Sequence, residues 1–165
     1  MSTDLRAVQK PLKDRYRAEP SAAMITLSAV GASGDAPIAC SVEVGRAIHE
    51  AQAHSGVGGA GTAACSGDML LGALAACAQI TCQMVATAMG LPVSKISVTA
   101  EGDLDLRGTL GVDREVPVGF QDIRLRFDVD APELSGAQID ELIEKTRRYC
   151  VVLKTLEEPP AVTIT

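Results

Sequence analysis

Aromatic side chains are nearly absent from this chain. Its 165 residues include no Trp, two Tyr and two Phe, although 47% of the residues are apolar. The core must therefore be built from Ala, Val, Leu and Ile, which bury less area per residue than aromatic side chains do. The length suits one domain, but a core of this kind favours completion of the apolar burial by a second subunit.

Basic charge is scarce as well, because 15 Lys and Arg stand against 21 Asp and Glu and the formal net charge is −6. Nucleic-acid recognition needs a basic face or aromatic stacking platforms, so we expect no nucleic-acid partner. The first residues carry Asp4 and no apolar run, which is not the pattern of a secretory signal. We therefore expect a cytoplasmic, reducing location.

The cysteines lack the spacing of a metal site. Cys40, Cys65, Cys77, Cys82 and Cys150 form no CxxC pair, and the chain has only two His. The sequence therefore predicts no metal site. In a cytosolic chain of this size, such cysteines are expected to be buried small residues or reactive thiols before they are a disulfide framework.

Charge is missing from one long internal segment. Between residues 51 and 94, Asp68 is the only charged side chain. The apolar stretch 69–89 predicts a long helix that Ser66 or Gly67 caps, with Asp68 complementing the helix dipole in the first turn.

This helix is long enough to span a membrane, but its composition argues against that. It has no basic flank, and four polar residues lower its hydropathy: Gln79, Thr81, Gln83 and Thr87. We therefore expect no membrane partner. A helix that is apolar nearly all round is expected to be buried on most sides, at the centre of a fold or of a dimer.

Strand patterns flank the long helix on both sides. Residues 22–30 and 38–44 predict a hairpin, with a weaker third run at 46–53. After the helix, residues 96–102 and 123–130 alternate apolar and polar side chains, which is typical of antiparallel strands with one solvated face.

A second helix is predicted after Pro132. Ser135 and Gln138 form a capping box, and an apolar stripe follows: Ile139, Leu142, Ile143, Thr146 and Cys150. We expect a long loop at 107–119 and a short last strand at 162–164. The sequence thus predicts an α+β fold with a single domain at 21–165, preceded by a loosely held N-terminal arm at 1–20.

The two predicted helices should bring Cys77 and Cys150 together, because Cys77 lies on an apolar stripe of the first helix and Cys150 on that of the second. Composition alone favours a buried small residue at each position. A reactive Cys77 would need a guanidinium to hold its thiolate, since apolar surroundings raise the pKa of a thiol. The candidates are Arg15, Arg17, Arg46, Arg147 and Arg148.

Three segments resemble the OsmC/Ohr proteins, the osmotically inducible and organic-hydroperoxide-resistance family. They are the run from Cys65 to Cys77 (CSGDMLLGALAAC) after the glycine-rich residues 58–61, the stretch 147–153 (RRYCVVL) and the stretch 117–123 (PVGFQDI). The resemblance extends over residues 22–165. It implies antiparallel sheets wrapped around two long central helices in an intertwined homodimer, with sites at the subunit interface.

The resemblance also implies an activity, which is the reduction of organic hydroperoxides in oxidative and osmotic stress defence. The peroxidatic cysteine of the family matches Cys77 and the resolving cysteine matches Cys150, with an external dithiol as reductant and no cofactor. Enzymatic members hold the thiolate with an Arg from the N-terminal hairpin region and a Glu near the start of the central helix. Here the hairpin turn has no Arg, Asp68 lies near the acidic position, and Val151 stands where Pro is common.

Those differences keep an alternative open, namely a non-catalytic OsmC-like protein that binds a small apolar ligand at the dimer interface. Cys65 adds a further possibility. At the N-terminus of the long helix its thiol would gain from the helix dipole, so it could act as an extra redox partner.

Overall fold

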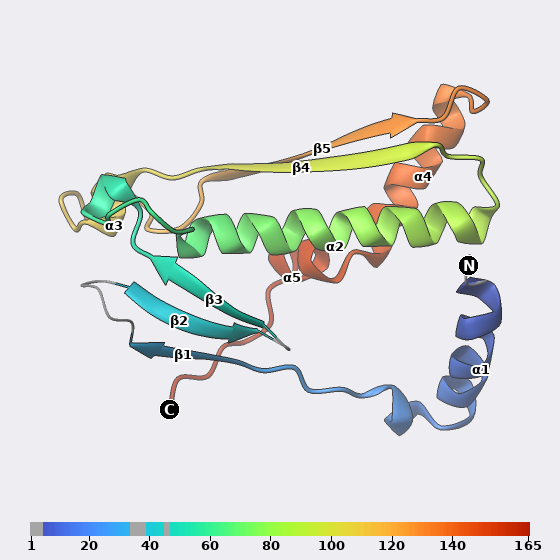
Figure 1. Cartoon of the computed structure of the whole chain (residues 1–165), viewed down its shortest axis with the longest axis horizontal. Coiled ribbons are helices and arrows are strands. Elements are labelled where there is room, and N and C mark those ends of the chain that lie inside the picture. Colours follow the sequence, from blue (N-terminus) through green and yellow to red (C-terminus); the bar gives the residue numbers. More distant parts are fainter. Residues whose placement is uncertain (1–4, 34–38, 45–46) are drawn as a thin grey trace.

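The protein is described by a computed structural model that covers residues 5–33, 39–44 and 47–165. Its central element is α2 (Ser66–Met89), a helix of 24 residues. The hairpin of β4 (Lys95–Asp103) and β5 (Asp122–Asp130) runs along one side of α2 (Figure 1). The amide of Gln79 donates to the carbonyl oxygen of Ile96 at 2.9 Å and ties α2 to β4.

A three-stranded antiparallel sheet lies on the other side of α2, near its N-terminal half (Figure 1). Its strands, in the order in which they pair, are β1 (Ala29–Ser33), β2 (Ala39–Val44) and β3 (Ala47–Gln52). Ala51 of β3 also pairs in parallel with Ala64, just before α2. The sheet is therefore joined directly to the start of the central helix.

Two helices complete the core, α4 (Gly136–Tyr149) and α5 (Val151–Glu157). The capping box of Ser135 and Gln138 begins α4, as predicted. The contact between α2 and α4 is a buried cluster of Cys82, Val85, Ala86 and Leu142. The expected α+β fold is confirmed, and so are the third strand and the two strands after the long helix.

The predicted hairpin of the first two strands is present, but its first strand is shifted toward the C-terminus, and the predicted last strand is wrong. Residues 20–23 form a 3-10 turn, η1 (Pro20–Ala23), so the first strand is confined to 29–33, and residues 162–164 form no strand. Both segments carry exposed apolar side chains, with Met24 82% and Ile164 94% exposed. An apolar pattern indicates that one face of a segment will be buried. A β-strand also needs a neighbouring strand to hydrogen-bond with, and neither segment has one within the described part of this chain.

The N-terminal arm contains a helix, α1 (Leu5–Ala18), which the sequence did not predict. Its Arg6 guanidinium donates to the carbonyl oxygens of Thr87 at 3.2 Å and Ala88 at 2.8 Å. These carbonyls belong to the last turn of α2, and that of Thr87 also accepts from the N–H of Gly90 at 3.1 Å. The loop expected at 107–119 also differs, because α3 (Leu106–Thr109) occupies its start.

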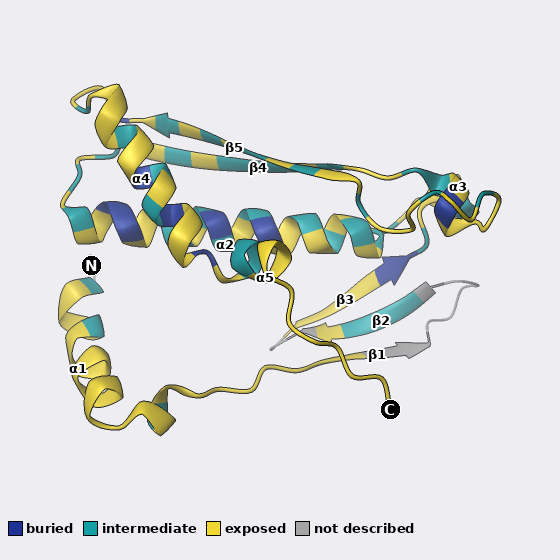
Figure 2. Cartoon of the chain, turned by 180° about the vertical axis from the view of Figure 1, so that it is seen from behind, coloured by how far each residue is buried: buried dark blue, intermediate teal, exposed yellow. Residues whose placement is uncertain are grey.

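The burial of α2 is one-sided. Leu74, Ala78, Cys82, Val85 and Ala86 are buried. The opposite side faces solvent, with Ile80 56% exposed, and exposed residues recur along the helix (Figure 2). By length and composition α2 could cross a membrane, a property that the core helix of a soluble protein shares. A single chain thus does not bury α2 on most sides, and its burial in a dimer, the other expected arrangement, stays a prediction.

Candidate functional site

Cys77 and Cys150 lie together, as the sequence predicted. Cys77 is in the fourth turn of α2, and Cys150 lies between α4 and α5. The two thiols hydrogen-bond to each other, and neither cysteine forms a disulfide. Cys150 is fully buried with Leu74 and Ala78, whereas Cys77 is half-buried against this cluster. The Cys77 residue is thus partly accessible to solvent, whereas Cys150 is enclosed by the core.

A bend in the chain at Cys150 shapes this site. Its extended backbone (φ −74°, ψ 107°) ends α4 and begins α5. The Cys150 N–H donates to the carbonyl of Thr146, and its carbonyl accepts from the N–H of Lys154, both at 2.9 Å. The first amides of a helix have no partner inside the helix. Here the first three amides of α5 donate hydrogen bonds to the sulfurs of Cys77 and Cys150.

The pKa of the Cys77 thiol is lowered. Burial acts to raise this pKa, but hydrogen bonds act in the opposite direction and outweigh it. They come from four groups around the sulfur: the N–H of Val152, the Cys150 thiol, the Thr81 hydroxyl and the N–H of Val151. The pKa of Cys77 therefore lies below the ordinary value of a cysteine thiol, which favours the thiolate relative to an unperturbed cysteine.

The pKa of Cys150 shifts the other way. Burial raises it most, and the nearby Cys77 raises it further, through its hydrogen bond and its charge. The N–H groups of Leu153 and Val152 act to lower it but do not compensate. The first proton to leave the pair is consequently that of Cys77, and Cys150 remains a neutral thiol.

Sequence reasoning missed the groups that lower the pKa of Cys77. Thr81 lies one helical turn after Cys77, a spacing that could have revealed it. The sequence gives less indication that the backbone amides of residues 151 and 152 act on Cys77. Val151 retains a backbone N–H that Pro would lack, but the role of this N–H depends on the bend at Cys150.

The predicted arginines do not reach Cys77 within the described chain. Arg15 and Arg17 lie on α1, near the far C-terminal end of α2 (Figure 1), and Arg17 pairs with Asp14 at 2.9 Å. Arg46 lies outside the described residues. Among the residues that are described, no guanidinium contributes to the lowered pKa of Cys77.

The two arginines that precede Cys150 are engaged elsewhere. Arg147 forms an ion pair with Glu157, with Nε 2.9 Å from the carboxylate oxygen. The guanidinium of Arg148 lies over the ring of Tyr149, 5.6 Å from its centroid. Although they precede Cys150 directly in the sequence, neither guanidinium is directed at its thiol.

Asp68 and Cys65 form the start of α2. The Cys65 N–H donates to the Asp68 carboxylate at 2.9 Å, and the Asp68 N–H donates to the Cys65 sulfur at 3.5 Å. This capping box puts the cap at Cys65 instead of the predicted Ser66 or Gly67. The bond from the Cys65 N–H is the main reason that the pKa of Asp68 is lowered. Nine residues separate Asp68 from Cys77, about 13 Å along the helix, so Asp68 does not touch that thiol.

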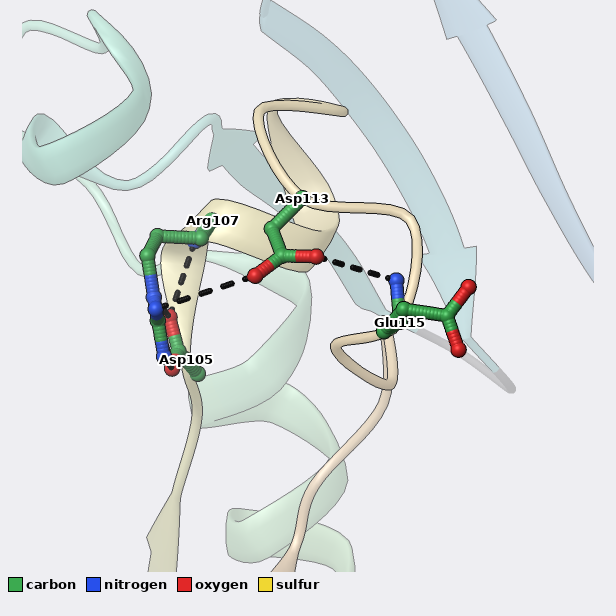
Figure 3. Close-up of polar contacts among 4 residues, drawn as sticks. All are labelled: Asp105, Arg107, Asp113 and Glu115. Atoms are coloured by element: carbon green, nitrogen blue, oxygen red, sulfur yellow. Dashed lines mark hydrogen bonds and ion pairs between the residues drawn. The ribbon is translucent and has the colours of Figure 1, made fainter.

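Arg107 is a further guanidinium, in α3, at the start of the loop between β4 and β5 and near the N-terminal end of α2 (Figure 1). Its guanidinium donates to both oxygens of Asp105. It also lies 3.8 Å from one carboxylate oxygen of Asp113, whose other oxygen accepts from the N–H of Glu115 at 3.1 Å (Figure 3). Two carboxylates thus neutralise its charge. Arg107 orders this loop and does not replace the missing arginine at Cys77.

A groove of about 540 Å³ lies beside the side chains that enclose Cys150, and both apolar residues and the Arg147–Glu157 ion pair line it, whereas neither thiol does. Its bed consists of Ile123, Leu125 and Phe127 of β5, which face α4 and α5. Leu74 and Leu153 line the groove and also pack around Cys150. The groove therefore reaches the layer of side chains that encloses the thiols. Within the described residues, no group of His, Cys, Asp or Glu is placed to hold a metal ion.

Solved structures resemble this chain closely in fold. The OsmC-like protein from Mycoplasma pneumoniae has a TM-score of 0.67 at 18% identity, covering 82% of this chain and 89% of that chain. An organic hydroperoxide resistance protein from Elizabethkingia anophelis has a TM-score of 0.66 at 18% identity, covering 82% and 91%. A further one, from Legionella pneumophila, has a TM-score of 0.65 at 20% identity, covering 82% and 92%.

A search of curated proteins gives no match. The model of the family described as OsmC-like protein matches residues 59–165, which is more than half of the chain and includes both Cys77 and Cys150. Together with the shared fold, this match confirms the resemblance inferred from the cysteine segments: the chain belongs to the OsmC-like protein family.

Proposed function

We propose that this protein is a cysteine-based peroxidase that reduces organic hydroperoxides, with Cys77 as the peroxidatic and Cys150 as the resolving residue. The observation that carries the proposal is the contact between two thiols whose pKa values are shifted in opposite directions. In such a pair the thiol with the lowered pKa, Cys77, is the nucleophile, and the thiol with the raised pKa, Cys150, is its partner in disulfide formation. The hydroperoxide resistance proteins that share the fold support the same reaction class.

The first step is attack of the Cys77 thiolate on the terminal peroxide oxygen. An S–O bond forms, the O–O bond breaks, and the leaving alkoxide takes a proton to become an alcohol. Cys77 is oxidised by two electrons to a sulfenic acid. The amides of Val151 and Val152 hold the thiolate without an arginine, because they donate to the charged sulfur.

The second step forms a disulfide. The Cys150 sulfur attacks the Cys77 sulfur, an S–S bond forms, and the hydroxyl leaves as water with the thiol proton. Oxidation of Cys77 removes its negative charge, and with it one cause of the raised pKa of Cys150. The resolving thiol thus becomes more reactive once it is needed. An external dithiol then reduces the disulfide and is itself oxidised, which suits the cytoplasmic location that we propose.

The groove suggests the class of peroxide. Its bed of Ile123, Leu125 and Phe127 can hold an organic tail, whereas hydrogen peroxide gains nothing from apolar contacts. We therefore expect organic hydroperoxides to be consumed faster than hydrogen peroxide.

The direct test is peroxide consumption by the full-length protein with cumene hydroperoxide and excess dithiothreitol. We expect turnover, and without dithiothreitol we expect one Cys77–Cys150 disulfide per chain by mass spectrometry of the digested protein. No consumption above the protein-free rate would overturn the proposal. A disulfide that contains Cys65 would instead assign the resolving role to that thiol.

A binding protein without catalysis is the second candidate, and the lack of a guanidinium at Cys77 within the described residues favours it. In that case a small apolar ligand would be bound at the dimer interface. Titration of the Cys77 thiol discriminates the two candidates. The peroxidase requires a pKa below about 8.5, and the binding protein predicts that value or a higher one.

Val151→Pro tests the amide support of the thiolate. Proline is favoured at the first position of a helix, so α5 should still form while the N–H that donates to Cys77 is removed. We expect the pKa of Cys77 to rise and the peroxidase rate at pH 7 to fall by about two- to tenfold. Val151→Ala keeps the N–H and is the control. The measurement is the pH dependence of Cys77 alkylation, and equal profiles for the two variants would exclude a role for this amide.

A further inference from the structure

The helix α1 differs in charge from the rest of the molecule. It carries five basic side chains and one acidic one, whereas the whole chain has a net charge of −6. It lies at the C-terminal end of α2, away from both sheets, and an extended segment joins it to β1 (Figure 1). A cationic helix is thus attached to an acidic body at one point, through the bonds of Arg6 to the end of α2.

The same helix carries an apolar stripe. Leu5, Val8, Leu12 and Tyr16 follow one another at spacings of three and four residues, so they lie on one face. Val8 is 48%, Leu12 43% and Tyr16 38% exposed. All residues from 5 to 18 are described, and none of them is buried (Figure 2).

Basic side chains flank this stripe on both sides. At 100° per residue, Arg15 lies on one side of the stripe and Lys13 on the other, while Asp14 lies opposite it. Lys10 and Arg17 both pair with Asp14, at 2.7 and 2.9 Å, on exposed surface. An apolar stripe between cations, with a tyrosine on it, is the pattern of a helix that lies in a membrane interface.

A helix of 14 residues is only marginally stable in water without a surface to cover its apolar face. An acidic protein surface would satisfy the cations of α1 but not its stripe. An anionic bilayer satisfies both, because lipid phosphates meet the cations and the acyl region meets Leu12 and Val8. The sequence predicted no membrane partner from the composition of the long apolar helix, a reason that does not apply to α1.

We propose that α1 docks the protein reversibly onto anionic membrane surfaces. The full-length protein is mixed with vesicles of phosphatidylglycerol and phosphatidylcholine, or of phosphatidylcholine alone, and the bound fraction is measured by co-sedimentation. We expect binding to the anionic vesicles, little binding to the neutral ones, and loss of binding as the salt concentration rises. Equal binding to both vesicle types, or none to either, would overturn the proposal.

Two variants assign the binding to α1. Lys13→Glu with Arg15→Glu should reduce the affinity for anionic vesicles by about tenfold or more. Arg114→Glu with Arg126→Glu changes the net charge equally on the exposed surface of the body and should leave most of the binding intact. Equal losses in the two double variants would show that overall charge, and not α1, determines the binding.

A second copy of the chain is the competing occupant of the stripe. Tyr149→Phe leaves Tyr16 as the only tyrosine in a protein without tryptophan, so its fluorescence reports on α1. We expect acrylamide to quench Tyr16 in the protein alone and to quench it less with anionic vesicles. Protection of Tyr16 without vesicles would show that another protomer covers α1 and would overturn the proposal. None of these outcomes depends on peroxidase activity.

Discussion

Cys77→Ser is expected to reduce consumption of cumene hydroperoxide to the rate seen without protein, a loss of about three orders of magnitude or more. The reason is that the serine hydroxyl is not ionised at neutral pH and cannot replace the thiolate as nucleophile. The hydrogen bonds of Val152, Val151 and Thr81, which lower the pKa of Cys77, then have no anion to stabilise. The measurement is the initial rate with excess dithiothreitol.

Two variants control this result. Cys82→Ser removes the buried thiol five residues later in the same helix, where burial raises the pKa, and should retain most of the activity. Cys150→Ser should leave the first turnover intact and accumulate a sulfenic acid on Cys77, which dimedone traps. Full activity of Cys77→Ser, or equal losses in Cys77→Ser and Cys82→Ser, would contradict the assignment of Cys77.

The sequence predicted the elements that carry their own local signals. The long helix ends at Gly90 in the left-handed conformation, and the capping box at Ser135 begins α4. The alternation in 96–102 and 123–130 corresponds to the observed register, with Ile96 opposite Val129 and Gly102 opposite Ile123. Each of these features depends on a few neighbouring residues or on a simple period.

The predictions that were wrong or missing concern features that depend on residues distant in the sequence. Whether residues 22–28 and 162–164 form strands is decided by a neighbouring strand, which their own pattern cannot specify. The pairing of Cys77 with Cys150 followed from the apolar stripes of two helices. The same stripes could not predict which backbone amides act on the thiols, because the placement of these amides depends on the backbone bend at Cys150. Side-chain patterns thus located the site, and backbone geometry determined its electrostatics.

The exposed side of α2 indicates where a second subunit would lie. Leu70, Ile80 and Met84 are exposed apolar residues on the same stripe as Cys77. Leaving such a stripe in water is unfavourable, as is leaving the segments around Met24 and Ile164 without strand partners. We therefore propose a homodimer in which α2 of one protomer is covered by the other. Because Ile80 is one turn from Cys77, such an interface would also enclose the thiol.

Ile80→Lys is accordingly expected to convert the dimer to monomers. Two ammonium groups would be buried per dimer, and a cost of about 3 kcal/mol or more corresponds to at least about a hundredfold weaker association. Light scattering coupled to size exclusion measures the mass, and Val118→Lys, on an exposed apolar loop residue, is the control. We expect peroxidase activity to fall with the dimer, although a cation near Cys77 lowers its pKa and would by itself favour the thiolate. A folded wild-type monomer, or a fully active monomeric Ile80→Lys, would place the site within one chain.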